Sequence, residues 1–584
     1  MLMRTGAWGW WVGLIVLAGT CPAEAQEILY DPENPAFQEV REPAPETPVQ
    51  DEQACGEPEC EAEGAEVLVD PENPGAEVLV DPENARPAHL VAYPPTSGAF
   101  QTTELTIHLG TGVWRDLAAD APDEDLWELS TELGLRISYE PSSRLRAVLA
   151  ARASHWAARP VGGPFRAYDD VALDEAYIVW RPGRLRLSIG NQRTPWGSTD
   201  ITRPGDVINP SGLRSPGSGG AFGASLPQLT AEAAYTFDAF ALSAVVVPFF
   251  KPDNLALFGR DTALATRRNP FIAEELPFIL LAQDLLDPSI WPQAQPLLQS
   301  ANRPMATPAN ASVGLRVTTT LANTDLGLGG YYGWDRTPYM EMDEDLRTLL
   351  NLIAEDGQLF ADFDAIGFAA RNPEAIPLSQ RLSARAEAGE TLFRSEFRRR
   401  LTAVADLARY VGPIGVRADV AFSPRRVFYT TTMAPVIRAS VFSALGLSYE
   451  RLLAGERVLA LTLEGFWLHP FAADGALSRA LVPREQAGDA DDELLIFEGG
   501  YYGVAGALNW GTGLWKIDVQ AGAMLSIAPG DVIGQLALER PFARGMRARL
   551  SANLFYGPDP AERLTLGGLW SANDQVALSV VGSF

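Results

Sequence analysis

The sequence has no long apolar run beyond its N-terminus, although hydrophobic residues make up 47% of its 584 residues. A helix that crosses a membrane needs about 20 consecutive, mostly apolar residues. The absence of such a run excludes a helical membrane span after the N-terminal segment. A membrane protein of this composition would have to be a β-barrel, because lipid-facing and lumen-facing residues alternate along a barrel strand and the average composition looks soluble.

Basic residues are also in the minority, and the net charge of −28 makes nucleic acid an unsuitable partner. The acidity is concentrated near the N-terminus, where residues 26–90 contain eighteen acidic residues against Arg41 and Arg86, a net charge of −16. This segment is rich in Pro, Glu and Ala and has few bulky apolar residues. We therefore predict that it is disordered.

Motifs of known enzymes are missing. The sequence contains no Gly-x-Ser-x-Gly, no His-Glu-x-x-His and no phosphate-binding glycine loop. Histidine occurs four times, at scattered positions. We therefore predict no enzyme, no cofactor and no metal site. Two alternatives stay open: a catalytic triad scattered over barrel strands, and calcium binding by the acidic run at residues 488–493, for which a solvated loop is the plainer interpretation.

The N-terminus has the features of a secretory signal peptide. Arg4 precedes an apolar stretch from Trp8 to Ala18, and Ala23-Glu24-Ala25 forms a small-x-small cleavage site. We expect cleavage before Gln26. The alternative is a lipoprotein that begins at Cys21, but the Thr directly before this cysteine fits such sites poorly.

Cleavage of the signal peptide would remove Cys21 and leave two of the three cysteines, Cys55 and Cys60. In an oxidising periplasm, two cysteines this close in sequence predict one small disulfide loop. A metal site at this position would need further ligands, and the surrounding sequence does not supply them. The predicted barrel would then contain no cysteine.

A short phrase recurs in the acidic segment. Asp-Pro-Glu-Asn begins at Asp31, Asp70 and Asp81, each time after a short apolar stretch. One hypothesis is that each copy docks on a periplasmic protein, with the apolar stretch added as a strand to the edge of the partner's sheet. The alternative is a solvated linker with a recent duplication. The predicted organisation is therefore a signal peptide (1–25), an acidic periplasmic tail (26–98) and a barrel (99–584).

From residue 100 onward, apolar residues recur with a period of two, which is typical of strands half in lipid and half in water. Residues 546–556 show it best: Ala548, Leu550 and Leu554 share one face, while Arg547, Arg549 and Asn553 share the other. Short turn signals alternate with longer connections, as a membrane barrel requires. The turn signals lie near residues 140–143, 182–183, 238–239, 322–325, 411–413, 452–456, 510–513 and 541–545.

Eight short turns and nine longer connections predict about 18 antiparallel strands, with both termini in the periplasm and long extracellular loops. The segment Leu564–Trp570 resembles a further strand, but an odd count would place the C-terminus outside the cell, so we assign it to the last outer loop. The chain ends on an alternating strand with a terminal aromatic, Phe584. This ending resembles the signal that barrel-assembly machinery reads. We expect contact with outer-membrane lipid and lipopolysaccharide.

Charged residues occupy positions predicted to face the lumen. Opposed arginine and carboxylate walls would orient a polar or anionic solute. The alternative is that the charges pair across neighbouring strands. The predicted lumen-lining residues are Arg136, Arg144, Arg146, Arg184, Arg186, Arg394, Arg398, Arg400, Arg547, Arg549, Glu128, Glu132 and Asp419.

Two long connections contain apolar patterns. Residues 272–300 are rich in Leu, and residues 343–355 have amphipathic helical spacing. Such segments need burial, either in the barrel mouth, at an entry site for a lipid-like ligand, or against each other. Tryptophans near strand ends suggest interfacial girdles. These are Trp114, Trp156, Trp180, Trp334, Trp467 and Trp515.

One stretch of about forty residues contains several linked motifs. Asp174-Glu175-Ala176-Tyr177 precedes Gly190-Asn191-Gln192, then Trp196-Gly197, and then Asp206-x-x-Asn209-Pro210. This series resembles a large group of proteobacterial outer-membrane porin-like barrels, although that group has Gly-Arg-Gln at the second motif. The resemblance implies that the third outer loop packs into the lumen. The implied anchors of this loop are Gly190, Trp196, Gly197, Asp200 and Asn209.

The sequence thus predicts an exported outer-membrane β-barrel. The favoured function is a channel for passive passage of small solutes. The alternative is an export conduit or outer-membrane anchor of a larger envelope machine, for polysaccharide, lipid or motility, which would recruit periplasmic proteins through residues 26–90.

Overall fold

The structure is a computed structural model. The chain divides into two units, Met1–Pro95 and Thr96–Phe584, and every residue that the structure describes belongs to the second. The structure describes residues 102–584 except for 118–124, 161–165, 214–223, 256–303, 305–306, 337, 357–364, 389, 391–392, 432–433, 455–456, 490–492, 496–499, 559–564 and 572.

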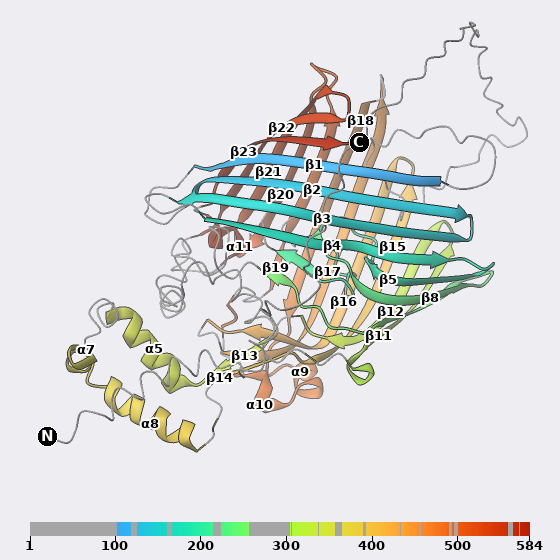
Figure 1. Ribbon diagram of the computed structural model, residues 1–584. Helices are drawn as coiled ribbons and strands as arrows, with labels where there is room; N and C mark the ends of the chain where they lie inside the picture. The colour runs from blue at the N-terminus through green and yellow to red at the C-terminus, as the bar shows by residue number, and fades with distance from the viewer. Residues whose placement is uncertain are drawn as a thin grey trace, which may run out of the picture. The chain divides into compact units, whose positions relative to one another are not determined.

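Eighteen strands form one closed antiparallel sheet (Figure 1). Each strand pairs with the next along the chain, and the last strand pairs with the first, from His108↔Ser583 to Asp116↔Gln575. The strands are β1 (Thr102–Asp116), β2 (Asp125–Ser142), β3 (Leu145–Pro160), β4 (Arg166–Trp180), β5 (Leu185–Gln192), β8 (Gln228–Thr236), β9 (Ala241–Val247), β11 (Ser312–Leu321), β12 (Thr324–Trp334), β15 (Arg399–Val411), β16 (Ile414–Tyr429), β17 (Pro435–Leu453), β18 (Arg457–Pro470), β19 (Tyr501–Gly511), β20 (Asp518–Ala528), β21 (Val532–Ala543), β22 (Met546–Tyr556) and β23 (Gln575–Ser583).

The connections alternate between short turns and mostly longer loops, which confirms the predicted count of 18 strands. We call the two ends of the barrel the turn end and the loop end. All eight predicted turns lie within a few residues of the observed ones. The first strand begins and the last strand finishes at the turn end, where Ile107 and Phe584 exchange backbone hydrogen bonds of 3.0 Å. The barrel therefore has both of its chain ends on one side.

Other elements lie within the connections at the loop end. Of the segment Leu564–Trp570, which we assigned to the last loop, the described residues 565–570 contain a short helix and no barrel strand. Among the residues placed by the structure, no helix is long and apolar enough to cross a membrane. The remaining elements are β6 (Ser211–Leu213), β7 (Ala224–Ser225), β10 (Asn254–Leu255), η4 (Pro308–Asn310), β13 (Tyr339–Met342), α5 (Glu344–Asp356), α7 (Ala365–Arg371), α8 (Ala375–Glu387), β14 (Phe393–Glu396), α9 (Ala476–Leu481), α10 (Arg484–Ala487) and α11 (Leu566–Leu569).

The helix predicted at residues 343–355 is confirmed as α5. Asp343 Oδ1 accepts hydrogen bonds from the backbone N–H groups of Asp345 and Leu346, which satisfies donors at the start of the helix. Helix α5 packs against α8, and Leu349 of α5 and Leu382 of α8 are buried. The apolar face of this segment is therefore covered by the loop's own helices, the third of the burial sites that we considered.

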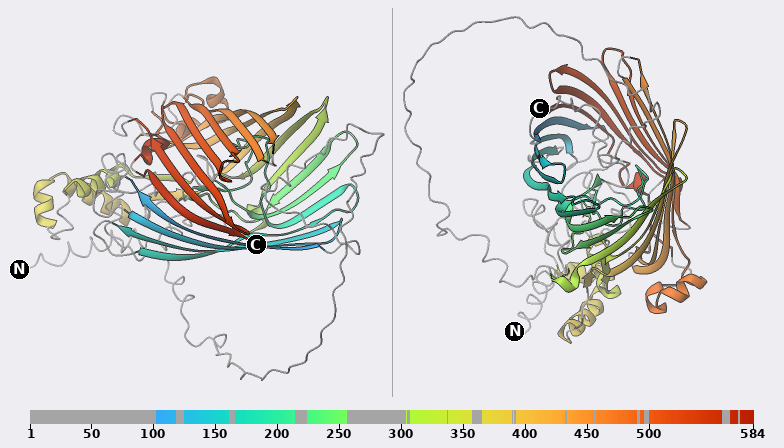
Figure 2. Two further views of the ribbon diagram at one scale, coloured as in Figure 1. Left: turned by 90° about the horizontal axis from the view of Figure 1, so that it is seen from above. Right: turned by 90° about the vertical axis from the view of Figure 1, so that its right-hand side faces the viewer.

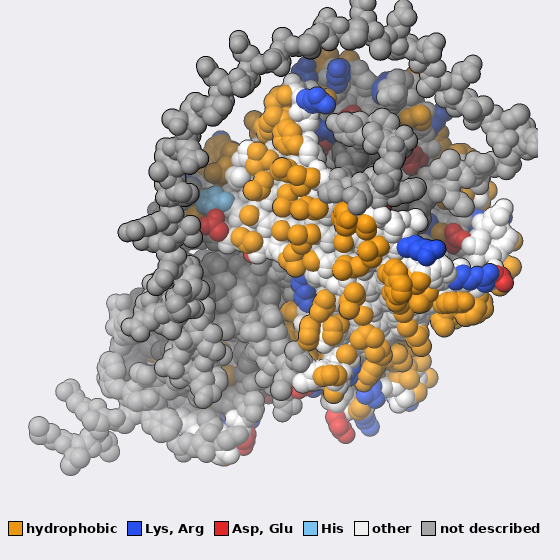
Figure 3. All heavy atoms as spheres, turned by 45° about the vertical axis from the view of Figure 1, so that its right-hand side comes forward, with side chains coloured by type: hydrophobic (Ala, Val, Ile, Leu, Met, Phe, Trp, Pro, Cys, Tyr) orange, Lys and Arg blue, Asp and Glu red, His pale blue; other side chains and the backbone are white. Residues whose placement is uncertain are grey.

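The outer face of the barrel is apolar. Large hydrophobic side chains point away from the sheet along strands on all sides of the barrel, and Figure 3 shows many of them in orange, close together on one face. Examples that are 45–66% exposed are Leu133, Leu149, Ile178, Ile189, Leu315, Leu328, Leu445, Leu463, Leu525, Leu550 and Leu578. Because the sheet is closed, no strand edge is left to be hidden from lipid. The fold is a transmembrane antiparallel β-barrel, as predicted.

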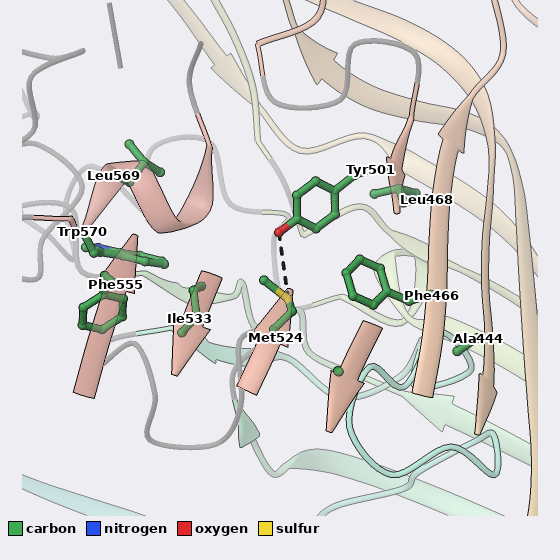
Figure 4. Close-up of a cluster of buried hydrophobic side chains, with 10 residues drawn as sticks. Ala444, Phe466, Leu468, Tyr501, Met524, Ile533, Phe555, Leu569 and Trp570 are labelled. Atoms are coloured by element: carbon green, nitrogen blue, oxygen red, sulfur yellow. Dashed lines mark hydrogen bonds between the residues drawn. The ribbon is translucent and has the colours of Figure 1, made fainter. Parts of the chain in front are cut away.

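The inner face combines charged residues with apolar clusters. One cluster lies on inward positions of β17 to β22, where Phe466, Tyr501 and Met524 are at most 4% exposed (Figure 4). Helix α11 contributes Leu569 and Trp570 follows it, so the last loop packs onto this part of the wall. Both views in Figure 2 show the strands curving round to enclose this interior.

The alternation on β22 generates a prediction about stability. Leu550 lies in the middle of the strand and points outward. Replacing it with arginine should reduce the free energy of unfolding of the barrel in lipid vesicles by about 2–4 kcal/mol, because a charge at the bilayer midplane loses its hydration. Denaturant unfolding followed by tryptophan fluorescence would measure this. Tyr556→Arg, on the same face at the loop end, is the control and should cost about 0–1 kcal/mol. Equal costs at both positions would contradict the membrane placement.

Candidate functional site

In the connection from β5 to β8, the described residues 193–213 and 224–227 fold into the barrel, and we call them the lumen loop. At its base, the Gln192 side chain donates to Ser188 Oγ at 3.0 Å and to Thr230 Oγ1 at 2.9 Å, and Gln192 is 4% exposed. Asn191 Nδ2 donates to two carbonyls of β4. The Gly-x-Gln motif therefore ties the loop's first residues to the strands on both sides.

Gly190 belongs to the same base. Its φ is +139°, and a Cβ there would lie 2.1 Å from the carbonyl oxygen of Ala176. Only glycine allows this approach of β5 to β4. On the neighbouring strand, Glu175 lies between two arginines, Arg136 at 2.5 Å and Arg193 at 2.8 Å. The acidic residue of the first motif thus joins the wall to the start of the lumen loop.

The Asp-x-x-Asn-Pro motif forms a turn where the loop comes back. Asp206 accepts hydrogen bonds from the Asn209 side chain at 2.7 Å and from Ser225 Oγ at 2.6 Å. Asn209 Oδ1 in turn accepts from the backbone N–H of Thr194 at 2.8 Å. The outgoing and returning parts of the loop are therefore fastened to each other at this point, and Asn209 is 2% exposed.

Trp196 packs against the inside of the wall. It is 4% exposed and belongs to an apolar cluster with Val245 of β9, Tyr331 of β12 and Val404 of β15. A Cβ at Gly314 of β11 would lie 2.7 Å from the indole, so the small residue makes room for the ring. Burial of a tryptophan contributes a large apolar area. The loop therefore has an apolar attachment on strands that lie two to five positions away from its origin, β5.

Gly197 brings the backbone next to Asp419 of β16. Its φ is +98°, and a Cβ would lie 2.4 Å from Asp419 Oδ2. Asp419 accepts from the backbone N–H of Ser198 at 2.7 Å and from Thr199 Oγ1 at 2.7 Å. It is 0% exposed, which means that the loop covers this carboxylate completely.

Glu464 of β18 holds the next three residues. Its carboxylate accepts from the backbone N–H groups of Asp200 at 2.6 Å, Ile201 at 3.0 Å and Thr202 at 2.9 Å. Glu464 is 1% exposed. In the strand order, β18 is eight positions from β5, almost the opposite wall of an 18-stranded barrel. The lumen loop therefore extends across the interior from one wall to the other.

Asp200 contributes an acidic side chain of the lumen loop itself at this point. Its carboxylate pairs with Arg417 of β16. Burial raises the pKa of Asp200 above its usual value, and the positive charge of Arg417 opposes this effect. Arg336 adds a further contact, because its guanidinium donates to the carbonyl oxygens of Val207 and Asn209. All five predicted loop anchors therefore lie in or at the base of the lumen loop.

Most of the predicted lumen arginines have carboxylate partners close by. These contacts favour local pairing over separate arginine and carboxylate walls. The observed pairs are Arg136–Glu175, Arg146–Glu140, Arg186–Glu232, Arg400–Asp335, Arg547–Glu539 and Arg549–Glu539, at 2.5–3.4 Å, and Arg152–Glu132 at 3.7 Å. Glu128 accepts a hydrogen bond from the Trp156 indole at 3.0 Å.

Four of the predicted lumen arginines lie elsewhere. Arg144 and Arg184 are exposed at the turn end, where Arg184 pairs with Asp238 of the neighbouring turn. Arg394 lies on β14, which pairs with β13 in a separate two-stranded sheet. Arg398 stacks on Tyr339, with its guanidinium carbon 3.4 Å from the ring centroid. Alternation placed Arg394 and Arg398 on the wall because the barrel strand β15 begins only at residue 399, and it placed Arg144 and Arg184 there although both lie in turns between strands.

Two of the predicted girdle tryptophans point inward. Trp156 is 6% exposed and bonded to Glu128, and Trp114 donates to Ser130 Oγ at 3.4 Å. Trp180 and Trp467 are about half exposed on the outer face, where an interfacial position is consistent with their surroundings. Whether a tryptophan faces lipid depends on whether it occupies an outward or an inward position in the alternation along its strand. Its distance from the end of the strand does not decide this.

Sequence reasoning missed Glu464. One signal was available: residues 457–470 form an alternating apolar strand with a single carboxylate, and that carboxylate falls on the inward parity. Asp419 was predicted to line the lumen, but not to hold a loop. No local pattern links either residue to positions 198–202, which are more than 200 residues away in sequence.

Several predictions concern residues outside the described part of the chain. These are the disulfide between Cys55 and Cys60, the repeats at Asp31, Asp70 and Asp81, the apolar segment 272–300 and residues 490–492 of the acidic run 488–493. Within the described ranges, no three His, Cys, Asp or Glu side chains are grouped as a metal site.

Comparisons with protein-family models and with curated protein sequences returned no match. The chain is similar to several solved structures. OmpF of Salmonella typhi, in a complex with daunomycin, is 9% identical over 83% of this chain and 98% of its own, with a TM-score of 0.36. DcaP, an outer membrane channel of Acinetobacter baumannii, is 9% identical over 85% and 100%, with a TM-score of 0.35. OccK2 of Pseudomonas aeruginosa, in a complex with glucuronate, is 9% identical over 82% and 98%, with a TM-score of 0.37.

At these TM-scores the similarities carry no argument about function. The class of the protein follows from its own strand pairing and apolar outer face: it is a β-barrel of the outer-membrane type. The narrower group suggested by the motifs at residues 174–210 stays a resemblance.

The crowding at Gly197 generates a prediction. Gly197→Ala should reduce the free energy of unfolding by about 1–3 kcal/mol, because the new Cβ would collide with Asp419 and the backbone has a positive φ. Denaturant unfolding in detergent or vesicles would measure the loss. Gly330→Ala is the matched control, since a Cβ there would meet nothing within 4 Å. If the two variants are equally stable, the loop does not approach β16 as described.

Proposed function

We propose that this protein is a channel for small solutes across the outer membrane, and that the lumen loop narrows its passage. The observation that carries the proposal is the path of the loop, which starts at β5 and is bound to Asp419 and Glu464 on β16 and β18. Barrels of 16 to 18 strands are wide enough for an aqueous channel unless they are plugged. A segment fixed between two walls would reduce that width and set a size limit.

The charges near the loop support small polar solutes. Arg136, Arg152 and Arg193 keep 38–42% of their side chains exposed although each has a carboxylate partner. Groups of this kind exchange hydrogen bonds with water and with a passing solute. Paired charges of both signs would favour polar molecules without strong selection for one sign.

The placement of the chain ends supports an orientation. If the turn end faces the periplasm, β1 begins there and residues 26–98 lie in the periplasm after cleavage of the signal peptide. The last strand then presents Phe584 to the periplasmic side, where assembly machinery would read it. The apolar outer face would contact outer-membrane lipid and lipopolysaccharide.

Shortening the lumen loop tests the proposed narrowing. Thr194 and Asn209 are joined by a hydrogen bond of 2.8 Å, so residues 195–208 can be replaced by two glycines without stretching the chain. The expected result is a larger single-channel current step in a planar bilayer, because the segment across the lumen is gone. Circular dichroism would check that the barrel is intact. An unchanged step size in a correctly folded variant would contradict a role of the loop in narrowing.

The alternative function is an export conduit or an anchor in a larger envelope machine. The observation that favours it is the tail, with its net charge of −16 and three Asp-Pro-Glu-Asn copies at Asp31, Asp70 and Asp81. A periplasmic protein with a basic surface or an open sheet edge would suit such a segment.

Deletion of residues 26–90 separates the two functions. A channel should keep its conductance and its permeability for small sugars in liposome swelling, because all eighteen strands of the closed sheet lie within residues 102–583. A machine component should still assemble into the outer membrane but lose its cellular role. The matched control keeps the tail and replaces each Asp-Pro with Ala-Ala, which removes the repeats but not the length.

A further inference from the structure

Five consecutive residues of the lumen loop are bound by two carboxylates of the wall. Ser198 and Thr199 bind Asp419, and residues 200–202 bind Glu464. Backbone N–H groups of all five residues donate, at 2.6–3.3 Å. The hydroxyls of Thr199 and Thr202 add two further donors, at 2.7 and 3.0 Å. The Ser198 hydroxyl lies 3.0 Å from Asp419 Oδ1 and 2.8 Å from the carbonyl oxygen of Leu407, and its single proton reaches one acceptor at a time. Three of the four carboxylate oxygens therefore accept two hydrogen bonds from the loop, and Asp419 Oδ1 accepts at least one.

Both carboxylates depend on these donors. Asp419 is 0% and Glu464 1% exposed. Among the residues that the structure places, neither has an arginine or lysine within ion-pair distance. A buried carboxylate without hydrogen bonds is strongly unfavourable, and bonds to a charged acceptor are stronger than neutral ones. Departure of the loop would therefore leave two charges and five N–H groups without their partners at the same time.

We propose that Asp419 and Glu464 are the positioning residues of the lumen loop, and that each holds one part of it independently. We call the pair the loop anchor. Asp419 fixes residues 198–199 and Glu464 fixes residues 200–202. The proposal rests on the proposed function, because the position of this segment sets the width of the passage.

The barrel itself does not depend on the loop anchor. Neither carboxylate takes part in the sheet's hydrogen bonds, which join backbone groups. Asp419 lies opposite Asp406 and Ala444, and Glu464 lies opposite Gly446 and Ala505. Substitutions at these two positions should therefore release the loop while the strands stay paired.

The test uses Asp419→Asn, Glu464→Gln and the double variant in the full mature chain. The amides have nearly the same size, but each replaces an acceptor oxygen by an N–H₂ group that faces the loop's own donors. Glu539→Gln is the control, since Glu539 is also buried and inward but binds Arg547 and Arg549 of the wall. Hydrogen–deuterium exchange, resolved by overlapping peptides or by NMR so that residues 198–199 are read separately from residues 200–202, reads the anchor directly.

In Glu464→Gln, the amides of residues 200–202 should exchange at least about tenfold faster, while those of residues 198–199 stay protected. Asp419→Asn should give the reverse pattern. Planar bilayers should show current fluctuating between the wild-type level and a higher one in both variants, and a steady higher level in the double variant. Glu539→Gln should leave the exchange of residues 198–202 at the wild-type rate and should cause no switching between two current levels.

Two results would overturn the proposal. One is unchanged exchange of residues 198–202 in a folded double variant. The other is equal loss of protection over all five residues in both single variants, which would show that the two carboxylates do not act independently. If the carboxylate variants fail to fold, Thr199→Val and Thr202→Val each remove one hydroxyl donor from the loop. Thr199→Val should then accelerate the exchange of residues 198–199, and Thr202→Val that of residues 200–202.

The outcomes also separate this proposal from the channel function. A wild-type barrel without current steps, together with faster exchange in the variants, would contradict the channel and support the loop anchor. Normal steps together with unchanged exchange and conductance in the double variant would support the channel and contradict the anchor.

Discussion

Everything in this barrel depends on closure of the sheet between β23 and β1. In lipid, an unpaired backbone N–H or C=O costs several kcal/mol, because no water replaces the missing partner. The pairing from His108↔Ser583 to Asp116↔Gln575 removes the last open edge. It also divides the side chains into two sets that never exchange, an outer set that contacts lipid and an inner set that contacts water and loops. Leu578 and Ala577, adjacent in sequence, are 63% and 1% exposed for this reason.

Closure makes the interior a place where buried charge can be stabilised. A carboxylate on the inner face cannot reach the aqueous phase outside the wall, so it must bind other inner side chains or a segment that enters the lumen. Glu175 and Glu539 bind arginines of the wall. Asp419 and Glu464 bind the lumen loop. The same requirement therefore produces both the paired charges of the wall and the fixed position of the loop.

The glycine and tryptophan of the loop complement these polar contacts. Gly197 allows the backbone N–H groups to approach Asp419, and Trp196 buries a large apolar surface directly beside them. Polar contacts help to set the orientation of the loop, since an sp² oxygen accepts hydrogen bonds preferentially near the plane of its group. Apolar contact contributes affinity for the wall. A loop with only one of these would be less well positioned across the lumen.

The sequence by itself determined the class of fold, the number of strands, the turns and the region of the loop. These are local properties, because alternation, turn residues and the motifs at residues 174–210 are read over a few neighbouring positions. Which side chains meet across the lumen was decided only by the tertiary structure. Arg398 lies outside the wall because its barrel strand begins one residue later. Trp156 points inward because it occupies an inward position of its strand, and Glu464 contacts residues 200–202 because the closed sheet curves around the lumen. Contacts between residues more than 200 positions apart depend on the curvature and register of all the strands between them, and no local pattern encodes either.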